Sequence, residues 1–419
     1  PTKYLFLIYL FDISNKMKII KRQLYLNQVR PIIDKPVIKI VTGIRRCGKS
    51  YFIKQIIEEI KTQNKINKQQ ILYINKELFE FDFIENYTEL YNYVKKYFKD
   101  ANNKNYLFVD EIQEIKNWEK AIISLFAEEK YDIYITGSNA SLLSSELATL
   151  LSGRYIQIGL FPFNFNEFVE FRKTNAPVDE EFKLYLQFGG FPVIHFFDYI
   201  SENIYQYLQS LFNTVLIKDI VTRYNVRNVP LFENITKYVF DNTGNIFSGG
   251  SINKYLKSQN ISIGLDTIQN YLHYLENSFL AYKVKRYDIK GKKILEIYEK
   301  YYLVDVALKH ALGGYKQKDI SGMLENIVFL HLKCLNYKIF IGKFGDKEVD
   351  FVAKKTDKII YIQVAYLLES EETIKREFNV LFQIKDNYPK YVLSMDTMPK
   401  TNNNGIIRMN LIEFLLTFD

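Results

Sequence analysis

Cysteine is scarce in this sequence, which limits how the chain can be stabilised. Cys47 and Cys334 are the only two cysteines among 419 residues, so the fold cannot depend on a framework of disulfide bonds. Four histidines are present, and none has a metal-ligand spacing with these cysteines: His195, His273, His310 and His331. A structural zinc site is therefore not expected.

Long apolar runs are also missing. The strongly apolar stretch Tyr4–Phe11 is far shorter than the ~20 residues that a helix needs to cross a bilayer. A secretory signal is not favoured, because no small-residue cleavage site follows the stretch. We expect it to pack on the surface or on a partner, or to be translated leader ahead of Met17. No membrane association is expected.

The composition is that of a folded protein with several domains. Apolar residues make up 47% and charged residues 25% of the chain, which excludes a disordered protein. Its length of 419 residues is sufficient for two or three domains, each with its own core. The formal net charge of +8 permits a polyanionic partner, but the general abundance of lysine explains that charge equally well.

Residues 38–50 combine the features of a phosphate-binding loop. An apolar, β-branched run ends at GIRRCGKS, which extends from Gly43 to Ser50 and fits the pattern G-x-x-x-x-G-K-S. An apolar helical pattern begins directly afterwards, at Tyr51. Strand, glycine-rich loop and helix in this order are the context in which the motif binds the phosphates of a nucleotide.

The residue types in the loop have separate tasks. Gly43 and Gly48 allow backbone N–H groups to converge on a phosphate, towards which the next helix directs its positive end. Lys49 supplies a charge to the β- and γ-phosphates, and the Ser50 hydroxyl is a ligand for Mg²⁺. We therefore expect ATP and Mg²⁺ as cofactors. The residues expected to bind the nucleotide are Gly43, Ile44, Arg45, Arg46, Cys47, Gly48, Lys49, Ser50 and Tyr51.

A second apolar run, residues 106–111, is an expected strand that ends in two acidic residues. We expect Asp110 to hold Mg²⁺ and Glu111 to polarise the water molecule that attacks the γ-phosphate. Two acids at the end of a strand can also form a simple helix cap. The presence of Lys49 upstream favours the catalytic interpretation.

Strands and helices alternate as far as residue 139, which predicts an α/β fold with a parallel sheet. The last of these strands ends in a polar cluster, Thr136, Ser138 and Asn139. We expect this cluster beside the acidic pair as a sensor of the γ-phosphate, with an ordinary polar turn as the alternative.

Arg154 could contact a phosphate of its own or a neighbouring subunit, as arginine fingers do, or form an ordinary ion pair. The residues expected to act in catalysis are Glu111, Lys49, Asn139 and Arg154.

Four segments in this order carry a resemblance to a known family: GIRRCGKS, LFVDEIQ, ITGSNASLLSSELATLLSGRY and GLFPFNFNEF. They resemble the AAA-type P-loop ATPases of bacteria and archaea in which an ATPase core precedes an uncharacterised C-terminal region. The resemblance implies ATP binding and hydrolysis. The residues that match the family position by position are Lys49, Ser50, Asp110 and Glu111. Those that match less securely are Ser138, Asn139 and Arg154.

Residues 231–302 show a different pattern, in which two expected helices precede two expected strands. The second helix has apolar residues at helical spacing, and the lysine-rich sequence KGKK at residues 290–293 joins the strands. The arrangement resembles a winged helix-turn-helix. The side chains expected in the major groove, if DNA is bound, are Gln269, Asn270 and His273. Winged helices serve equally often as protein contacts.

The last hundred residues resemble the core of the PD-(D/E)xK nucleases, with one departure. The resemblance assigns Glu325, Asp350 and Gln363 to a second metal site, because the family's acids bind a divalent metal. Ala365 stands where the family has a lysine. A methyl group carries no charge, so we expect little or no cleavage unless a basic residue of the next helix reaches the site.

The sequence thus predicts a P-loop NTPase sheet, then a winged helix-turn-helix, then a small α/β domain like that of restriction endonucleases. The expected divisions are 1–34 (tail and helix), 35–164 (AAA-type ATPase core), 165–229 (helical lid or connector), 230–302 (winged helix-turn-helix) and 303–419 (nuclease-like domain, inactive). ATP hydrolysis is expected to switch the arrangement of the two C-terminal domains, which act on DNA or on a protein partner. An ATP-gated DNA nuclease and a non-hydrolysing regulatory protein are the alternatives. A homo-oligomer is compatible with the pattern, and the scarcity of cysteine suits the reducing cytoplasm.

Overall fold

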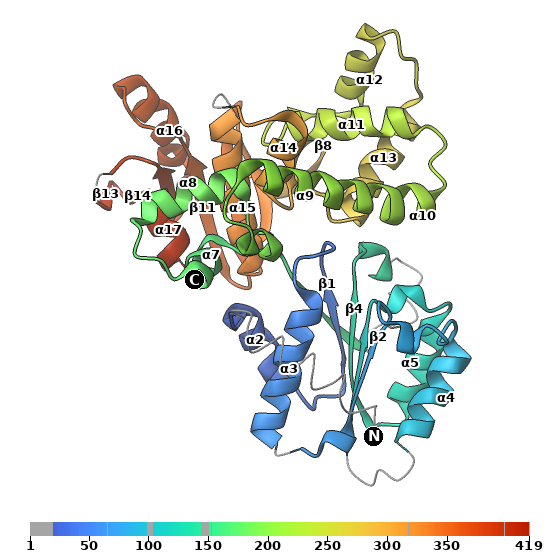
Figure 1. The fold of residues 1–419 in the computed structure, drawn as a ribbon. Coiled ribbons are helices and arrows are strands. Elements are labelled where there is room, and N and C mark those ends of the chain that lie inside the picture. The colour runs from blue at the N-terminus through green and yellow to red at the C-terminus, as the bar shows by residue number, and fades with distance from the viewer. Residues whose placement is uncertain are drawn as a thin grey trace.

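Two β-sheets organise the chain, one in its N-terminal part and one in its C-terminal part (Figure 1). The computed structural model describes residues 20–64, 66–98, 104–143, 151, 153–316, 319–397 and 399–418. The apolar stretch Tyr4–Phe11 lies outside the described residues, so its predicted packing stays a prediction.

The N-terminal sheet has five strands in the order β2-β3-β4-β1-β5, and all neighbouring pairs are parallel. Its strands are β1 (Ile38–Thr42), β2 (Ile71–Asn75), β3 (Asn105–Asp110), β4 (Tyr131–Gly137) and β5 (Tyr155–Gly159). The helices beside it are α2 (Gln23–Val29), α3 (Lys49–Asn64), α4 (Tyr87–Tyr97) and α5 (Trp118–Ala127). Because α2 and α3 cover one face and α4 and α5 the other, the central strands are buried on both sides (Figure 1). The predicted α/β fold with a parallel sheet is confirmed.

A set of helices follows the core and lies across its upper edge in Figure 1. These are α7 (Phe165–Arg172), α8 (Val178–Phe188), α9 (Ser201–Thr214), the π-helical segment η7 (Val215–Val221) and α10 (Thr222–Tyr224). Two glycines separate α8 from the short helix η6 (Pro192–Phe196). A Cβ on Gly190 would lie 2.1 Å from the backbone oxygen of Phe163, so this close approach of two backbone segments needs glycine.

The C-terminal sheet has nine strands in the order β13-β14-β12-β11-β10-β9-β7-β8-β6. Its strands are β6 (Ile246–Phe247), β7 (Ala281–Asp288), β8 (Lys293–Leu303), β9 (Lys338–Phe344), β10 (Lys347–Lys355), β11 (Lys358–Val364), β12 (Lys390–Ser394), β13 (Thr401–Asn403) and β14 (Ile406–Asn410). The helices of this part are α11 (Val229–Asp241), α12 (Gly249–Ser258), α13 (Leu265–Asn277), α14 (Val306–Gly313), α15 (Ile320–Cys334), α16 (Glu371–Gln383) and α17 (Leu411–Thr417).

The β7–β8 hairpin belongs to the same sheet as the last strands of the chain. Strand β7 pairs in parallel with β9, through Arg286 with Ile341 and Asp288 with Lys343. One hydrogen-bonded sheet therefore crosses the boundary predicted at residues 302 and 303. Two parts that share a sheet cannot rotate against each other without breaking those hydrogen bonds, so the hairpin and the C-terminal strands form one body.

A buried ion pair joins the start of the chain to the ATPase core and to α7. The guanidinium of Arg22 donates two hydrogen bonds to Glu167, 2.6 Å and 2.9 Å long, and one of 3.3 Å to the backbone oxygen of Cys47. A further bond of 2.9 Å reaches the backbone oxygen of Phe161. The side chains of Arg22 and Glu167 are only 4% and 8% exposed. The pair therefore fixes the back of the glycine-rich loop against α7.

We expect Arg22→Ala to lower the free energy of unfolding by about 3–5 kcal/mol, because Glu167 would remain buried without its partner. Urea denaturation of the whole chain measures this change. The matched control is Arg30→Ala, which removes a more exposed pair with Glu59, 3.0 Å long, and should cost less than about 1 kcal/mol. Equal losses in both variants would contradict the proposed role of Arg22.

Candidate functional site

The ammonium group of Lys49 lies in a polar network at the edge of the parallel sheet where the strands end. Lys49 is the first residue of α3 and is 4% exposed. Its Nζ donates to the backbone oxygens of Gly43 and Ile44, at 3.1 Å and 3.3 Å, and to Ser138 Oγ at 2.8 Å. Its distance to Glu111 Oε1 is 3.2 Å. The glycine-rich loop and the ends of β3 and β4 thus meet at one charged group.

Asp110 and Glu111 are held in place from two neighbouring strands. Asp110 accepts hydrogen bonds from the hydroxyls of Thr136 and Tyr73, the latter 2.9 Å long. The Glu111 carboxylate accepts from Ser138 Oγ at 2.7 Å, and its backbone N–H donates to Thr136 Oγ1 at 2.9 Å. Glu111 has a φ of 55°, in the left-handed region that is uncommon for a residue other than glycine.

Burial and charge compete in setting the protonation of this network. Burial by itself would raise the pKa of Glu111, but Lys49 and the hydrogen bond from Ser138 lower that pKa to about 2. Burial would lower the pKa of Lys49, but Glu111 and the nearby Cys47 and Asp110 raise it above its usual value. Both groups are therefore charged at neutral pH, and Glu111 is a very weak base while Lys49 remains beside it.

Other residues singled out from the sequence lie at different distances from this network. Ser50 follows Lys49 in the first turn of α3, and Asn139 is buried directly after Ser138. The backbone of Arg154 is not brought to the site. Its backbone oxygen accepts from the N–H of Ile38, at the opposite edge of the sheet from the loop. The length of β1 therefore separates the backbone of Arg154 from the glycine-rich loop, and contact of its side chain with a phosphate stays a prediction.

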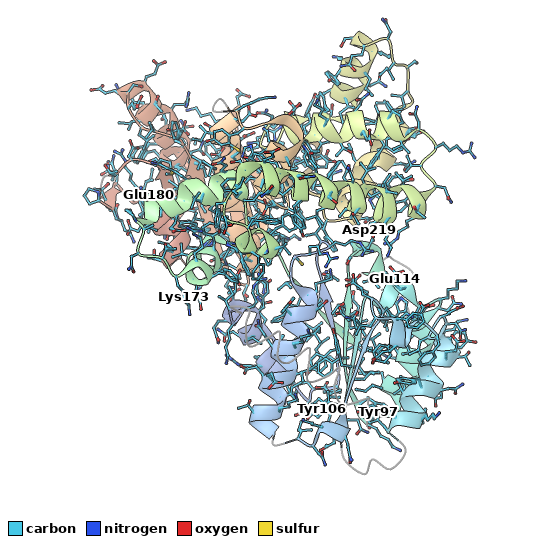
Figure 2. The ribbon with its side chains drawn as sticks, viewed as in Figure 1. Tyr97, Tyr106, Glu114, Lys173, Glu180 and Asp219 are labelled. Carbon is cyan, nitrogen blue, oxygen red and sulfur yellow. The ribbon has the colours of Figure 1, made fainter. Side chains whose placement is uncertain are left out.

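The helices above the core contact the glycine-rich loop through an ion pair. Arg45 Nε donates to Asp219 Oδ2 at 2.7 Å, and Asp219 belongs to η7. Figure 2 shows Asp219 facing Glu114 across the boundary between these helices and the core. The Asp219 side chain is only 3% exposed. The loop is thus in direct contact with the segment after α9.

A second charged cluster lies in the C-terminal sheet. It contains Glu325 of α15 and Asp350 of β10, two of the residues expected at a metal site, and their common neighbour is Lys300 of β8. Lys300 Nζ lies 3.2 Å from Glu325, 2.7 Å from Glu348 and 4.0 Å from Asp350. The backbone N–H of Asp350 donates to Gln363 Oε1 at 3.2 Å. An ammonium group therefore sits among these acids although Ala365 lacks one.

Among the residues that the structure describes, no group of three or more His, Cys, Asp or Glu side chains could hold a metal ion. The same residues include no helix that is both long and apolar enough to span a bilayer. At the C-terminal cluster, the Lys300 ammonium lies within 4.0 Å of Glu325, Glu348 and Asp350.

Sequence reasoning missed three residues of these sites. Tyr73 carries no motif, and Asp219 stands in a stretch of mixed charge to which no chemistry was assigned. Lys300 precedes the nuclease-like pattern in an expected wing strand. The sequence offers one signal, a charged residue within the apolar pattern of a strand or helix. This signal is weak because such residues usually face solvent.

Comparison with known proteins agrees with this geometry. Residues 35–169 match a family described as an AAA domain, and residues 179–319 match a domain of unknown function. A Walker-type ATPase of Pyrococcus abyssi, PABY2304, has a similar fold, with a TM-score of 0.51, 16% identity and coverage of 70% of this chain and 96% of that one. Residues 35–169 therefore match an AAA domain, and the fold of the chain resembles that of a Walker-type ATPase.

Two proteins that match most of this chain show the family to which it belongs. An uncharacterized protein of Haemophilus influenzae is 36% identical over 95% of this chain and 98% of its own length. The uncharacterized protein MJ1544 of Methanocaldococcus jannaschii is 34% identical over 87% of this chain and 81% of its own length. The chain belongs to the same family as these proteins.

We expect Lys300→Met to lower the free energy of unfolding by about 3–5 kcal/mol at pH 8, because it leaves buried carboxylates without a counter-ion. Burial already raises the pKa of both Glu325 and Asp350. In the folded chain these two acids therefore keep protons that the unfolded chain has released at the same pH. At pH 5 the two carboxyl groups carry less charge than at pH 8, so the loss of stability in Lys300→Met should be smaller there. Urea denaturation at the two pH values measures it.

The control for this variant is Lys283→Met in the same hairpin. Lys283 pairs with Glu299 at 2.6 Å, but its side chain is 30% exposed, so its loss should cost less than about 1 kcal/mol. A loss of stability in Lys300→Met that is equal at pH 5 and pH 8 would show that the acids do not depend on Lys300.

Proposed function

We propose that this protein binds ATP with Mg²⁺ at the glycine-rich loop and hydrolyses it. The observation that carries the proposal is the network around Lys49, in which the loop, Glu111 and Ser138 converge on one ammonium group. Backbone amides of residues 43–51 would bind the phosphates at the start of α3. Lys49 would contact the β- and γ-phosphates.

The donors near the loop fit Mg²⁺, because the Ser50 hydroxyl and the Asp110 carboxylate are oxygen ligands. Bound there, the ion would neutralise charge that develops on the γ-phosphate. Tyr73 and Thr136 orient the Asp110 carboxylate from both sides. Ser138 and Asn139 would sense the γ-phosphate, and in an oligomer Arg154 could approach a neighbouring subunit.

The strength of Glu111 as a base would depend on the nucleotide. In the network described above, Lys49 keeps the pKa of Glu111 low. A triphosphate that binds Lys49 removes part of that effect, so Glu111 becomes better able to polarise the attacking water. ATP binding would then itself make Glu111 a stronger base.

We infer that hydrolysis moves the helices above the core together with the C-terminal part as one body. The shared nine-stranded sheet disfavours movement of the hairpin against the last strands, and the packing of α14 against α8 and α9 connects the helices above the core to this part. A nucleotide can drive such a change only if it binds the two arrangements with different affinity. A requirement for ATP, together with two free buried cysteines, favours the cytoplasm.

We expect Lys49→Ala to abolish nucleotide binding, because the phosphates lose their main charged partner. Glu111→Gln should bind ATP and hydrolyse it at least ~100-fold more slowly, because an amide cannot act as a base. Titration with a fluorescent ATP analogue and a phosphate-release assay test the two variants. Normal turnover by Glu111→Gln would remove that residue from the mechanism. Nucleotide binding without turnover in the unmodified protein would instead favour a non-hydrolysing regulator.

We propose duplex DNA as the partner of the α11–β8 region, with a protein partner as the alternative. Helix, short strand, two helices and hairpin follow in the order of a winged helix-turn-helix. Three lysines at the hairpin turn are exposed, as are the three polar side chains expected to face DNA. Helix α13 also packs against η5 (Ala140–Leu143) of the core, so entry of α13 into a groove would require the core to move away.

We expect the triple variant Lys290→Ala, Lys292→Ala and Lys293→Ala to bind duplex DNA more weakly. The slope of log affinity against log salt should fall by about one for each lysine that contacts a phosphate. Fluorescence anisotropy of labelled DNA at several salt concentrations measures both quantities, and ATPase rates with and without DNA provide a second readout. An unchanged slope would exclude the hairpin from DNA contact.

A second candidate function is ATP-gated cleavage of DNA. It is favoured by the juxtaposition of Glu325, Asp350 and Gln363, and by Lys300, which could supply the ammonium missing at Ala365. Metal-dependent nicking of plasmid that is lost in Asp350→Ala would support cleavage. No nicking with Mg²⁺ or Mn²⁺, at any nucleotide state, would leave Lys300 as a counter-ion only.

A further inference from the structure

Arg45 of the glycine-rich loop is surrounded by acidic groups from two parts of the molecule. Its Nε binds Asp219 at 2.7 Å, and its terminal nitrogens lie 3.9 Å from Glu77 and 3.7 Å from Glu114. Glu77 and Glu114 are 48% and 38% exposed, whereas Asp219 is 3% exposed. The interaction with Asp219 is therefore the desolvated one, and it is the one that water screens least.

The position of Arg45 places its guanidinium between the loop and the helices above it. Arg45 directly follows Gly43 and Ile44, whose backbone oxygens accept from Lys49. It is also close enough to Glu111 for the two charges to interact. A guanidinium binds phosphate oxygens with two parallel hydrogen bonds, so a phosphate group would compete strongly with Asp219 for Arg45.

Asp219 belongs to a segment that leads away from the loop. Segment η7 is π-helical, a form that occurs often at functional sites, and it continues into α10. At the end of α10, the ring of Tyr224 stacks on Tyr274 of α13 with 3.9 Å between centroids. Asn277 of α13 also donates to the Tyr224 hydroxyl at 3.0 Å. The partner of Arg45 is therefore in the same helical segment as the contact with α13.

We propose that Arg45 exchanges Asp219 for the γ-phosphate of ATP, so that a triphosphate, and not a diphosphate, releases η7 from the loop. This inference rests on the proposed ATP binding and adds a means of discriminating ATP from ADP. Arg45 is the residue that contacts the nucleotide. Asp219 is a positioning residue that competes for it. Release of η7 would remove one of the contacts that hold α10 and α13 near the core, another being the packing of α13 against η5.

The test is a double-mutant cycle in the full-length chain, with fluorescent analogues of ATP and ADP titrated in parallel. Arg45→Ala should weaken ATP binding at least about tenfold, the worth of a charge-assisted hydrogen bond, and change ADP binding less than about twofold. Asp219→Asn should tighten ATP binding several-fold because Arg45 loses its competitor. When Arg45 is already replaced by alanine, Asp219→Asn should leave the affinity for ATP unchanged.

Two further variants separate this role from a structural one. Arg45→Lys keeps the charge but lacks the planar fork, so its loss of ATP affinity should be intermediate. Lys218→Ala, also in η7, removes an exposed contact with Glu114 at 3.8 Å and should change neither affinity. Circular dichroism confirms that each variant is folded before titration.

The outcomes are distinguishable. Equal loss of ATP and ADP affinity in Arg45→Ala, or an Asp219→Asn effect that persists without Arg45, would overturn the exchange. An unmodified protein that binds neither nucleotide would overturn the proposed function and this inference with it. ATP binding that requires Lys49 but is indifferent to Arg45 would overturn this inference alone.

Discussion

A buried ammonium group can stay charged only if hydrogen-bonding partners replace the water it has lost, and Lys49 finds those partners on three neighbouring strand ends. Strand β4 lies between β1 and β3, so Ser138 stands between the loop and the acidic pair. Its hydroxyl bonds both Lys49 and Glu111. The whole nucleotide site therefore depends on a parallel sheet whose strand order brings these ends together.

The same network underlies the proposed response to ATP. Two cations of the loop have internal partners, Glu111 for Lys49 and Asp219 for Arg45. If ATP binds as proposed, its negative charges would compete with Glu111 for Lys49 and with Asp219 for Arg45. The first exchange would act on the Glu111 carboxylate, and the second would act on the helices above the core. Under this proposal, ATP hydrolysis and the movement of the helices above the core would both depend on residues of the same loop.

The C-terminal part contains a buried charge cluster whose members come from separate segments of the chain. Strands β9 to β11 and helix α15 bring Glu325, Asp350 and Gln363 together, but the cation among them comes from the hairpin. Lys300 thus links β8 of the hairpin to α15 and β10 through ion pairs, in addition to the backbone pairing of β7 with β9. A buried charge cluster of this kind tolerates no loss of its counter-ion, which makes it a constraint on the shape of this region.

The glycine-rich loop, its lysine and serine, and the acidic strand end could be predicted from the sequence because each is a local pattern: glycine, charge and hydroxyl at fixed spacing between a strand and a helix. The parallel sheet followed from the alternation of those elements. Asp219 lies 174 residues from Arg45, and Lys300 lies on a different element from the acids it contacts. Only packing decides which distant charges meet, because burial and distance set the strength of an ion pair. For the same reason the sequence could not decide between a phosphate contact and an ordinary ion pair for Arg154, whose backbone lies at the end of β1 opposite the loop.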